Sequence, residues 1–171
     1  MSSLLQTLER QPEYVHVLLN PLPIYGLAMG WIGLLIAFFQ RSRRAQIATL
    51  ALILVSAGSA WPVYEFGEQG YDRVLSMSDD AGQAWLDEHQ HRAEQLIYFF
   101  YALAALSAIA IIVPFKWPKT SAPLVITTIL LGAVVLGMSG YIAYAGGKVR
   151  HKEFRTEPPP NKKSTGASPT G

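Results

Sequence analysis

The sequence predicts an all-α protein: a four-transmembrane-helix up-down bundle with one long extramembrane loop and a disordered C-terminal tail. Half of the 171 residues are hydrophobic and only 15% are charged, a composition too apolar for an ordinary soluble domain. Four stretches approach the roughly 20 apolar residues that a helix needs to cross a bilayer core about 30 Å thick. Backbone groups in lipid must hydrogen-bond within their own segment, so these stretches predict helices.

The first helix is predicted over residues 15–39. We interpret it as a retained helix and not as a cleaved signal peptide, because no positively charged region precedes it and the run is too long for a signal-peptide core. The chain contains no cysteine, which excludes disulfides, thiolate metal sites and thiol catalysis.

The second helix is predicted over residues 46–64, with Pro62 near its end indicating a kink. The polar segment that follows, residues 65–95, is long and acidic, and its part before the third helix is predicted to be the extramembrane loop. Within this segment, Ser78 and the two aspartates after it supply a helix cap and an acidic first turn. The third helix is therefore predicted over residues 80–114, beginning outside the membrane and running into it.

The fourth helix is predicted over residues 123–147, which completes a four-helix transmembrane domain over residues 1–155. The remaining residues, 156–171, are mainly Pro, Ser, Thr, Gly and Lys. Because they offer almost nothing to bury, this tail is predicted to be disordered.

The short connections 40–46 and 115–123 are both basic. Lys and Arg in short loops stay on the cytoplasmic side, so the first three helices favour an N-terminus outside. The basic residues after the fourth helix, from Lys148 to Arg155, favour the opposite orientation. On balance the chain is predicted to lie in the bacterial inner (cytoplasmic) membrane with both termini in the periplasm.

Small residues predict which helix faces pack together, because lipid gives helices no hydrophobic reason to associate and close backbone contact must replace it. The predicted packing glycines are Gly26, Gly30 and Gly33 on the first helix and Gly137, Gly140 and Gly147 on the fourth. On this prediction Gly140→Leu separates the helices and lowers thermal stability more than Leu130→Ala on another face.

Histidines lie where three of the apolar segments meet polar sequence at one predicted membrane face. Imidazole is the commonest protein ligand for transition metals, and helical bundles build such sites from inward side chains. Residues two apart differ by about 200° around a helix, so only one of His89 and His91 can face the bundle, and His89 is favoured. The predicted cofactor-binding residues are His16, His89, His91 and His151, and the predicted metal ligands are His16, His89, His151 and Glu65.

Two functions follow from this pattern. The first is binding of haem b or a transition-metal ion at the periplasmic face, in the service of electron transfer. The second is a non-catalytic accessory or structural subunit that packs against a larger respiratory or photosynthetic membrane complex, with the histidines used for interfacial hydrogen bonds. Both imply contact with the lipid bilayer and with other membrane subunits or redox proteins. No catalytic triad, phosphate loop or nucleic-acid module is present, so we expect neither catalysis nor nucleic-acid binding.

Three short motifs resemble the bacterial membrane family called domain of unknown function 2231. The segment "HVLLNPLPI" resembles the family's opening H-P-x-L-V-H-F-P-I, "EHQHRAEQL" places histidine at the entrance to the third helix, and "GGKVRH" resembles the closing G-G-x-L-V-Y-x-H-G. The chain departs from the opening pattern at Val17 and at Pro21, where the family has a proline and a second histidine. The resemblance spans about residues 14–155. It implies no established activity, but some relatives look joined to redox proteins, which implies an electron-transfer setting.

Overall fold

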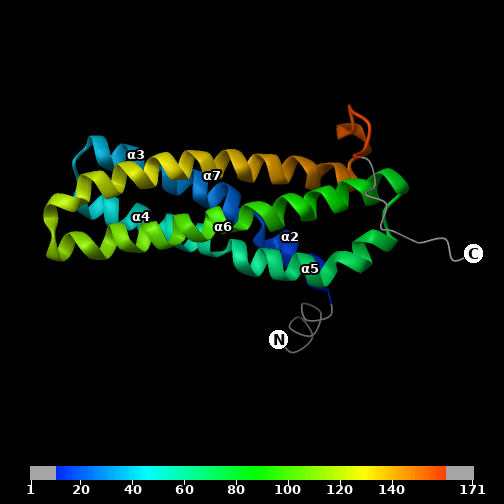
Figure 1. Cartoon of the computed structure of the whole chain (residues 1–171), viewed down its shortest axis with the longest axis horizontal. Coiled ribbons are helices and arrows are strands. Elements are labelled where there is room, and N and C mark those ends of the chain that lie inside the picture. The colour runs from blue at the N-terminus through cyan, green and yellow to red at the C-terminus, as the bar shows by residue number, and fades with distance from the viewer. Residues whose placement is uncertain (1–10, 161–171) are drawn as a thin grey trace, which may run out of the picture.

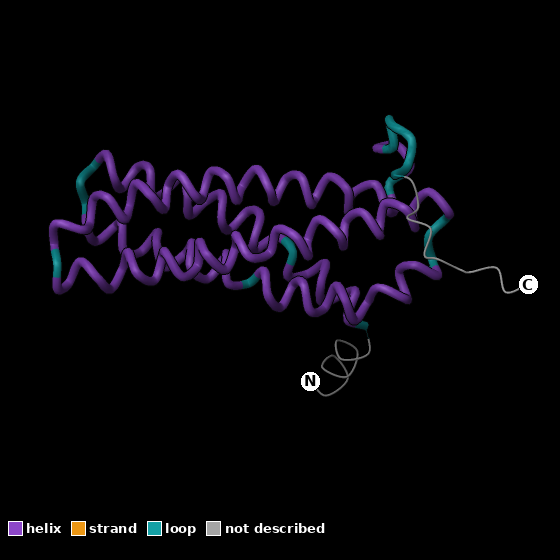
Figure 2. Tube along the Cα trace, in the orientation of Figure 1, coloured by secondary structure: helices purple, strands orange, loops and turns teal. Residues whose placement is uncertain are grey.

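Four long helical spans make up almost all of the described chain. The computed structural model describes residues 11–160, and within that range it contains helices, short turns and no strand (Figure 2). The first span comprises α2 (Pro12–Leu19), a π-helical turn (Leu22–Gly26) and α3 (Leu27–Phe39); the second comprises α4 (Arg43–Gly58) and α5 (Ala60–Ser76). The third is α6 (Asp80–Lys116), and the fourth is a 3₁₀ turn (Pro118–Thr120) with α7 (Ser121–Arg150), followed by a second 3₁₀ turn (Lys152–Phe154).

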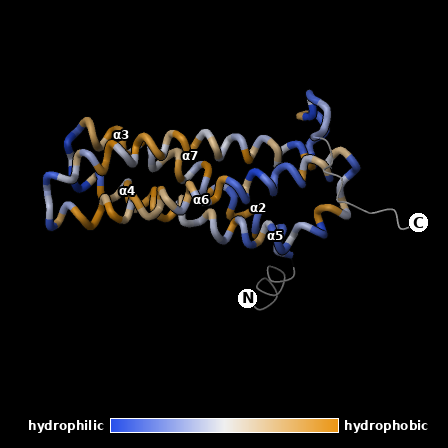
Figure 3. The backbone as a smooth tube through the Cα atoms, in the orientation of Figure 1, coloured by the Kyte–Doolittle hydropathy of each residue, from blue (hydrophilic) through white to orange (hydrophobic). Residues whose placement is uncertain are grey.

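Short connections make successive spans antiparallel, so the predicted up-down bundle is confirmed (Figure 1). The α3–α4 and α6–α7 connections lie at one end, which we call the basic end for its exposed Arg41, Arg44, Lys116 and Lys119. The α5–α6 turn lies at the other end, where α7 also finishes, and we call it the terminal end. Each span is long and apolar enough to cross a membrane, which defines the chain as a multi-pass membrane protein. Figure 3 shows polar residues at both ends, over a longer stretch at the terminal end.

The prediction of a long loop over residues 65–79 is wrong, because most of this segment is helical. α5 carries the second span on to Ser76, and α6 already begins at Asp80. Val63, Gly67 and Gly70 recur at helical spacing on the face that packs against α2 and α6, while Glu65 and Asp72 are exposed. The charged residues thus led to the prediction of a loop where the chain forms an amphipathic helix, whose small residues allow close packing.

Glycines bring the spans together in the first span, but not where they were predicted in the fourth. A Cβ built on Gly26 or Gly30 would come within 3.0 Å of an α4 side chain, and the same holds for Gly33. A Cβ on Gly137 or Gly140 would meet nothing within 4 Å. Both glycines lie off the buried face of α7, whose members include Val125, Thr128, Gly132, Val135 and Ser139. The predicted packing role of Gly137 and Gly140 is therefore corrected, and Gly132 against Trp31 takes that role. A Cβ built on Gly147 would meet only Phe154, at 3.7 Å in the segment after α7, so Gly147 does not bring another span close.

An arginine at the basic end compensates for a proline inside α6. Pro114 has no amide hydrogen to give to the carbonyl of Ala110, four residues earlier. Arg43 Nη2 donates to that carbonyl at 2.9 Å and to the carbonyl of Ile111 at 3.1 Å. The start of α4 is thereby fixed to the end of α6.

The chain beyond α7 folds back onto the terminal end as far as it is described. Arg155 donates to the carbonyls of Lys148 and Val149 at the end of α7 and to Asp79 at the start of α6. Glu157 accepts hydrogen bonds from Lys148 and Tyr144. Glu157 thus ties the start of the predicted tail to α7, residues 161–171 lie outside the described range, and the disorder of the tail stays a prediction.

Candidate functional site

Two of the four histidines face each other at the terminal end of the bundle. His16 lies on α2 and His89 on α6, with ring centroids 6.2 Å apart and ring planes at 87°. Both side chains are half-buried. They meet in the space between α2, α5, α6 and α7.

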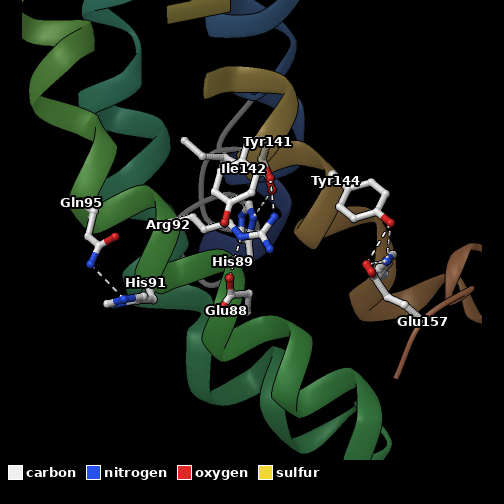
Figure 4. Close-up of polar contacts among 10 residues, drawn as sticks. Glu88, His89, His91, Arg92, Gln95, Tyr141, Ile142, Tyr144 and Glu157 are labelled. Carbon is white, nitrogen blue, oxygen red and sulfur yellow. Dashed lines mark hydrogen bonds and ion pairs between the residues drawn. The ribbon is translucent and has the colours of Figure 1, made fainter. Parts of the chain in front are cut away.

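Each imidazole is oriented by a backbone carbonyl of a neighbouring helix. His16 Nδ1 lies 2.7 Å from the carbonyl oxygen of Val63 on α5. His89 Nδ1 lies 2.9 Å from the carbonyl oxygen of Ile142 on α7 (Figure 4). A carbonyl oxygen can only accept, so Nδ1 carries the hydrogen in both rings and donates it. In a neutral imidazole this leaves the Nε2 lone pair available to a ligand, the arrangement that metal-ligating histidines adopt.

A glycine one turn beyond each carbonyl makes room for the ring. Gly67 follows Val63 by four residues, and Gly146 follows Ile142 by four. A Cβ on Gly67 would lie 3.0 Å from His16 Nδ1, and a Cβ on Gly146 would lie 3.0 Å from both Nδ1 and Cε1 of His89. The same device, a carbonyl acceptor with glycine four residues later on the helix, thus holds both histidines.

Two adjoining cavities meet at the histidine pair. The outer cavity has a volume of about 610 Å³, within the range of about 300–1,000 Å³ typical of small-molecule sites. The inner cavity is smaller, about 70 Å³, and almost entirely apolar, with Pro23, Ile97 and Phe100 in its wall. Residues that line both cavities are His16, Asn20, Tyr64, His89, Ala93 and Ala143.

The other two histidines do not join the pair. His91 is exposed on the opposite side of α6, where its Nε2 lies 2.9 Å from Gln95 Nε2 (Figure 4). His151 lies just beyond the end of α7, with 57% of its side chain exposed and its Nδ1 2.9 Å from Glu153. It lines the mouth of the outer cavity. The expected convergence of His16, His89 and His151 is therefore corrected: His16 and His89 meet, whereas His151 lies past the end of α7 at Arg150, with most of its side chain exposed.

Glu65 is exposed and accepts a hydrogen bond from Gln69 on its own helix, so it does not reach the histidines. Among residues 11–160, no group of three or more His, Cys, Asp and Glu side chains is placed to hold a metal ion. The four predicted metal ligands are consequently not brought together. What the described chain presents is a pair of imidazoles.

An arginine one turn from His89 holds α6 against α7. Arg92 donates to Glu88 at 2.7 Å and to the carbonyl oxygen of Tyr141 at 2.7 Å, and its guanidinium lies 3.7 Å from the centre of the Tyr141 ring (Figure 4). These contacts fix the register in which the carbonyl of Ile142 meets His89. They also occupy the guanidinium of Arg92 beside the histidine pair.

Sequence reasoning missed the two glycines beneath the rings. Gly67 stood in a segment taken for a loop, and Gly146 was used only as a motif residue. The signal that could have found them is the spacing V-x-x-x-G and I-x-x-x-G on two helices that flank histidines. Comparisons with models of known protein families, with curated proteins and with solved structures found no match, so the resemblance to domain of unknown function 2231 stays a prediction.

Proposed function

We propose that this multi-pass membrane protein binds a b-type haem with His16 and His89 as the two axial ligands and serves electron transfer. The observation that carries the proposal is the facing pair of imidazoles, each with Nδ1 donating to a carbonyl. Haem needs only axial ligands from the protein, since the porphyrin supplies the other four nitrogens. A pair of histidines therefore suits haem better than a bare metal ion.

The separation of the rings supports this assignment. An imidazole nitrogen lies about 2 Å from the metal that it ligates and the ring centre roughly 1 Å further, so two imidazoles on opposite sides of one ion have centres roughly 6 Å apart. The centroids of His16 and His89 are 6.2 Å apart. The spacing of the two rings therefore supports ligation of one iron by both imidazoles.

The surroundings of the pair also suit a flat ligand. A porphyrin held by the pair would occupy the outer cavity of about 610 Å³, which both histidines line. Apolar walls shield bound haem from water, which together with the axial ligands sets its reduction potential. When bound, the haem supplies reversible one-electron chemistry. The protein orients the imidazoles through Val63 and Ile142, and these hydrogen bonds strengthen the two nitrogens as ligands.

The orientation completes the proposal. The exposed basic residues of the short connections favour a cytoplasmic basic end, which places the histidine pair near the periplasmic face of a bacterial inner membrane. Electrons would then pass between the haem and a membrane-bound or periplasmic redox partner.

The test is an optical spectrum of the protein purified from native membranes, with haem content determined as the pyridine haemochrome. We expect about one haem per chain and a reducible spectrum of low-spin, six-coordinate iron. His16→Ala and His89→Ala should each lose most of the haem, because each removes one of only two axial ligands. His91→Ala is the matched control, since the same substitution two residues away removes an exposed imidazole.

A colourless wild-type protein, or haem content unchanged in His16→Ala and His89→Ala, would contradict the proposal. A colourless protein that co-purifies with large membrane subunits would instead favour the accessory-subunit function.

A further inference from the structure

Four basic residues lie at and just beyond the end of α7, and one of them differs from the rest. Lys148 pairs with Glu157, and both Lys152 and Arg155 pair with Asp79, at 3.2 and 2.8 Å. Among residues 11–160, the side chain of Arg150 has no hydrogen bond or ion pair. Arg150 is exposed and lines the outer cavity.

The position of Arg150 on α7 relates it to His89. The carbonyl of Ile142 holds His89, Gly146 lies beneath the ring, and Arg150 follows at the next step of four. Residues at this spacing lie on one face of a helix, each about 5–6 Å further along the axis. Arg150 therefore stands one turn beyond the ring of His89, on the water-facing side and above the same cavity.

The cavity is graded in polarity along that direction. Its deep part adjoins the apolar wall of Pro23, Ile97 and Phe100, whereas its mouth carries Arg150 and His151. A ligand that is apolar over most of its area and carries negative charge at one edge matches this gradient. The carboxylate side chains of b-type haem lie on one edge of the porphyrin, and guanidinium binds a carboxylate through two parallel hydrogen bonds.

We infer that Arg150 binds a carboxylate of the porphyrin edge and so sets which way round the haem enters the cavity. This inference rests on the proposed function. Glu13 and Glu68 also line the outer cavity, but neither is paired with Arg150. Glu13 pairs with Arg73 at 3.2 Å, and Glu68 accepts a hydrogen bond from Gln90.

The test compares two probes on one set of variants. Protein produced without added haem is titrated in detergent with haem b and with its dimethyl ester, in which both carboxylates are blocked, and binding is followed by absorbance. Arg150→Gln should weaken binding of haem b by roughly tenfold, the lower end of what a hydrogen bond between charged groups contributes. It should leave binding of the dimethyl ester within about twofold of the wild type, by the same reasoning.

Two further variants interpret the result. Lys152→Gln removes the same charge two residues away, from a side chain that does not line either cavity, and should bind both probes as the wild type does. Arg150→Lys keeps the charge without the paired hydrogen bonds and should fall between wild type and Arg150→Gln. Unchanged binding of haem b by Arg150→Gln, or equal weakening for both probes, overturns the role of Arg150. Loss of binding in His16→Ala and His89→Ala would still uphold the proposed function in that case, whereas a wild type that binds no haem b overturns both.

Discussion

At the scale of single residues, the site depends on two glycines as much as on two histidines. An imidazole can reach a helix carbonyl only if the side chain one turn further along does not block it. Gly67 and Gly146 meet this need on α5 and α7, each within 3.0 Å of a histidine ring if a Cβ is added. The orientation of both rings thus follows from main-chain acceptors and from absent side chains.

Gly146→Ala should therefore disturb His89 directly. The new Cβ must push the ring by a few tenths of an ångström away from the carbonyl of Ile142, and overpacking of this kind costs about 1–3 kcal/mol. We expect a lower midpoint of thermal unfolding in detergent and, under the proposed function, less bound haem. Gly140→Ala is the control on the same helix, because its Cβ meets nothing within 4 Å and alanine favours helix by up to about 1 kcal/mol. Equal midpoints and equal haem content in the two variants would show that the ring has room to move.

The sequence predicted part of this site. Spacing on the helix favoured His89 over His91, and the structure places His89 beside His16 while His91 faces away. The inclusion of His151 in the ligand set was not supported, because α7 ends at Arg150 and His151 no longer continues the glycine stripe of that helix. The two carbonyl acceptors could not be predicted either, because every residue has a main-chain carbonyl and the sequence does not indicate which one a histidine will contact.

At the scale of elements, the terminal end is joined by ion pairs between the start of α6 and the segment after α7. Asp79 caps α6 by accepting from the amide of Gly82 at 2.9 Å, and it also accepts from Arg155 and pairs with Lys152. The hydrogen bond from Arg155, supported by those from Gly82 and Lys152, holds the pKa of Asp79 well below its ordinary value. The hydrogen bond from Lys148 likewise lowers the pKa of Glu157.

These lowered pKa values predict a loss of stability in acid. A carboxyl group whose pKa is depressed in the folded state stabilises it fully above the unfolded pKa, about 3.9 for Asp, and loses that contribution as the pH falls through the folded value. The midpoint of thermal unfolding should therefore be similar at pH 7 and pH 5 and should fall below pH 4. Asp79→Asn should reduce this fall, because asparagine still caps the helix but has no carboxyl group that takes up a proton in acid.

A fall in Asp79→Asn as steep as in the wild type would assign the acid sensitivity to other carboxyl groups. Glu157→Gln is the companion variant, since it removes the second carboxyl group that holds the segment after α7.

The existence of this segment's contacts was not predictable from composition. Residues 156–160 look like a flexible tail, and only the positions of Lys148 and Tyr144 on the folded helix give Glu157 its partners.

At the scale of the whole molecule, the length of the apolar stretches predicted the bundle correctly, but charged residues led to wrong predictions of where the helices end. The four spans were found because each contains an uninterrupted apolar stretch of sufficient length. Their extents at the terminal end were underestimated, since α5 reaches Ser76 and α7 reaches Arg150 beyond the apolar stretches. A helix that leaves the membrane but stays packed against its neighbours keeps its buried apolar face, while its outer face becomes polar. The mean hydropathy then falls although the helix continues, so a prediction from hydropathy alone ends the helix too early.

The distribution of charge over the whole molecule also predicts its orientation. Arg41, Arg44, Lys116 and Lys119 are exposed at the basic end, and positive charge in short connections is retained in the cytoplasm. A reporter fused after Arg44 should therefore behave as cytoplasmic, and one fused after Ser78, in the short turn between α5 and α6, should behave as translocated. Periplasmic alkaline phosphatase and cytoplasmic fluorescent-protein fusions give opposite readouts and check each other. The reverse pattern would place the histidine pair on the cytoplasmic side, and its redox partner would then have to be sought there.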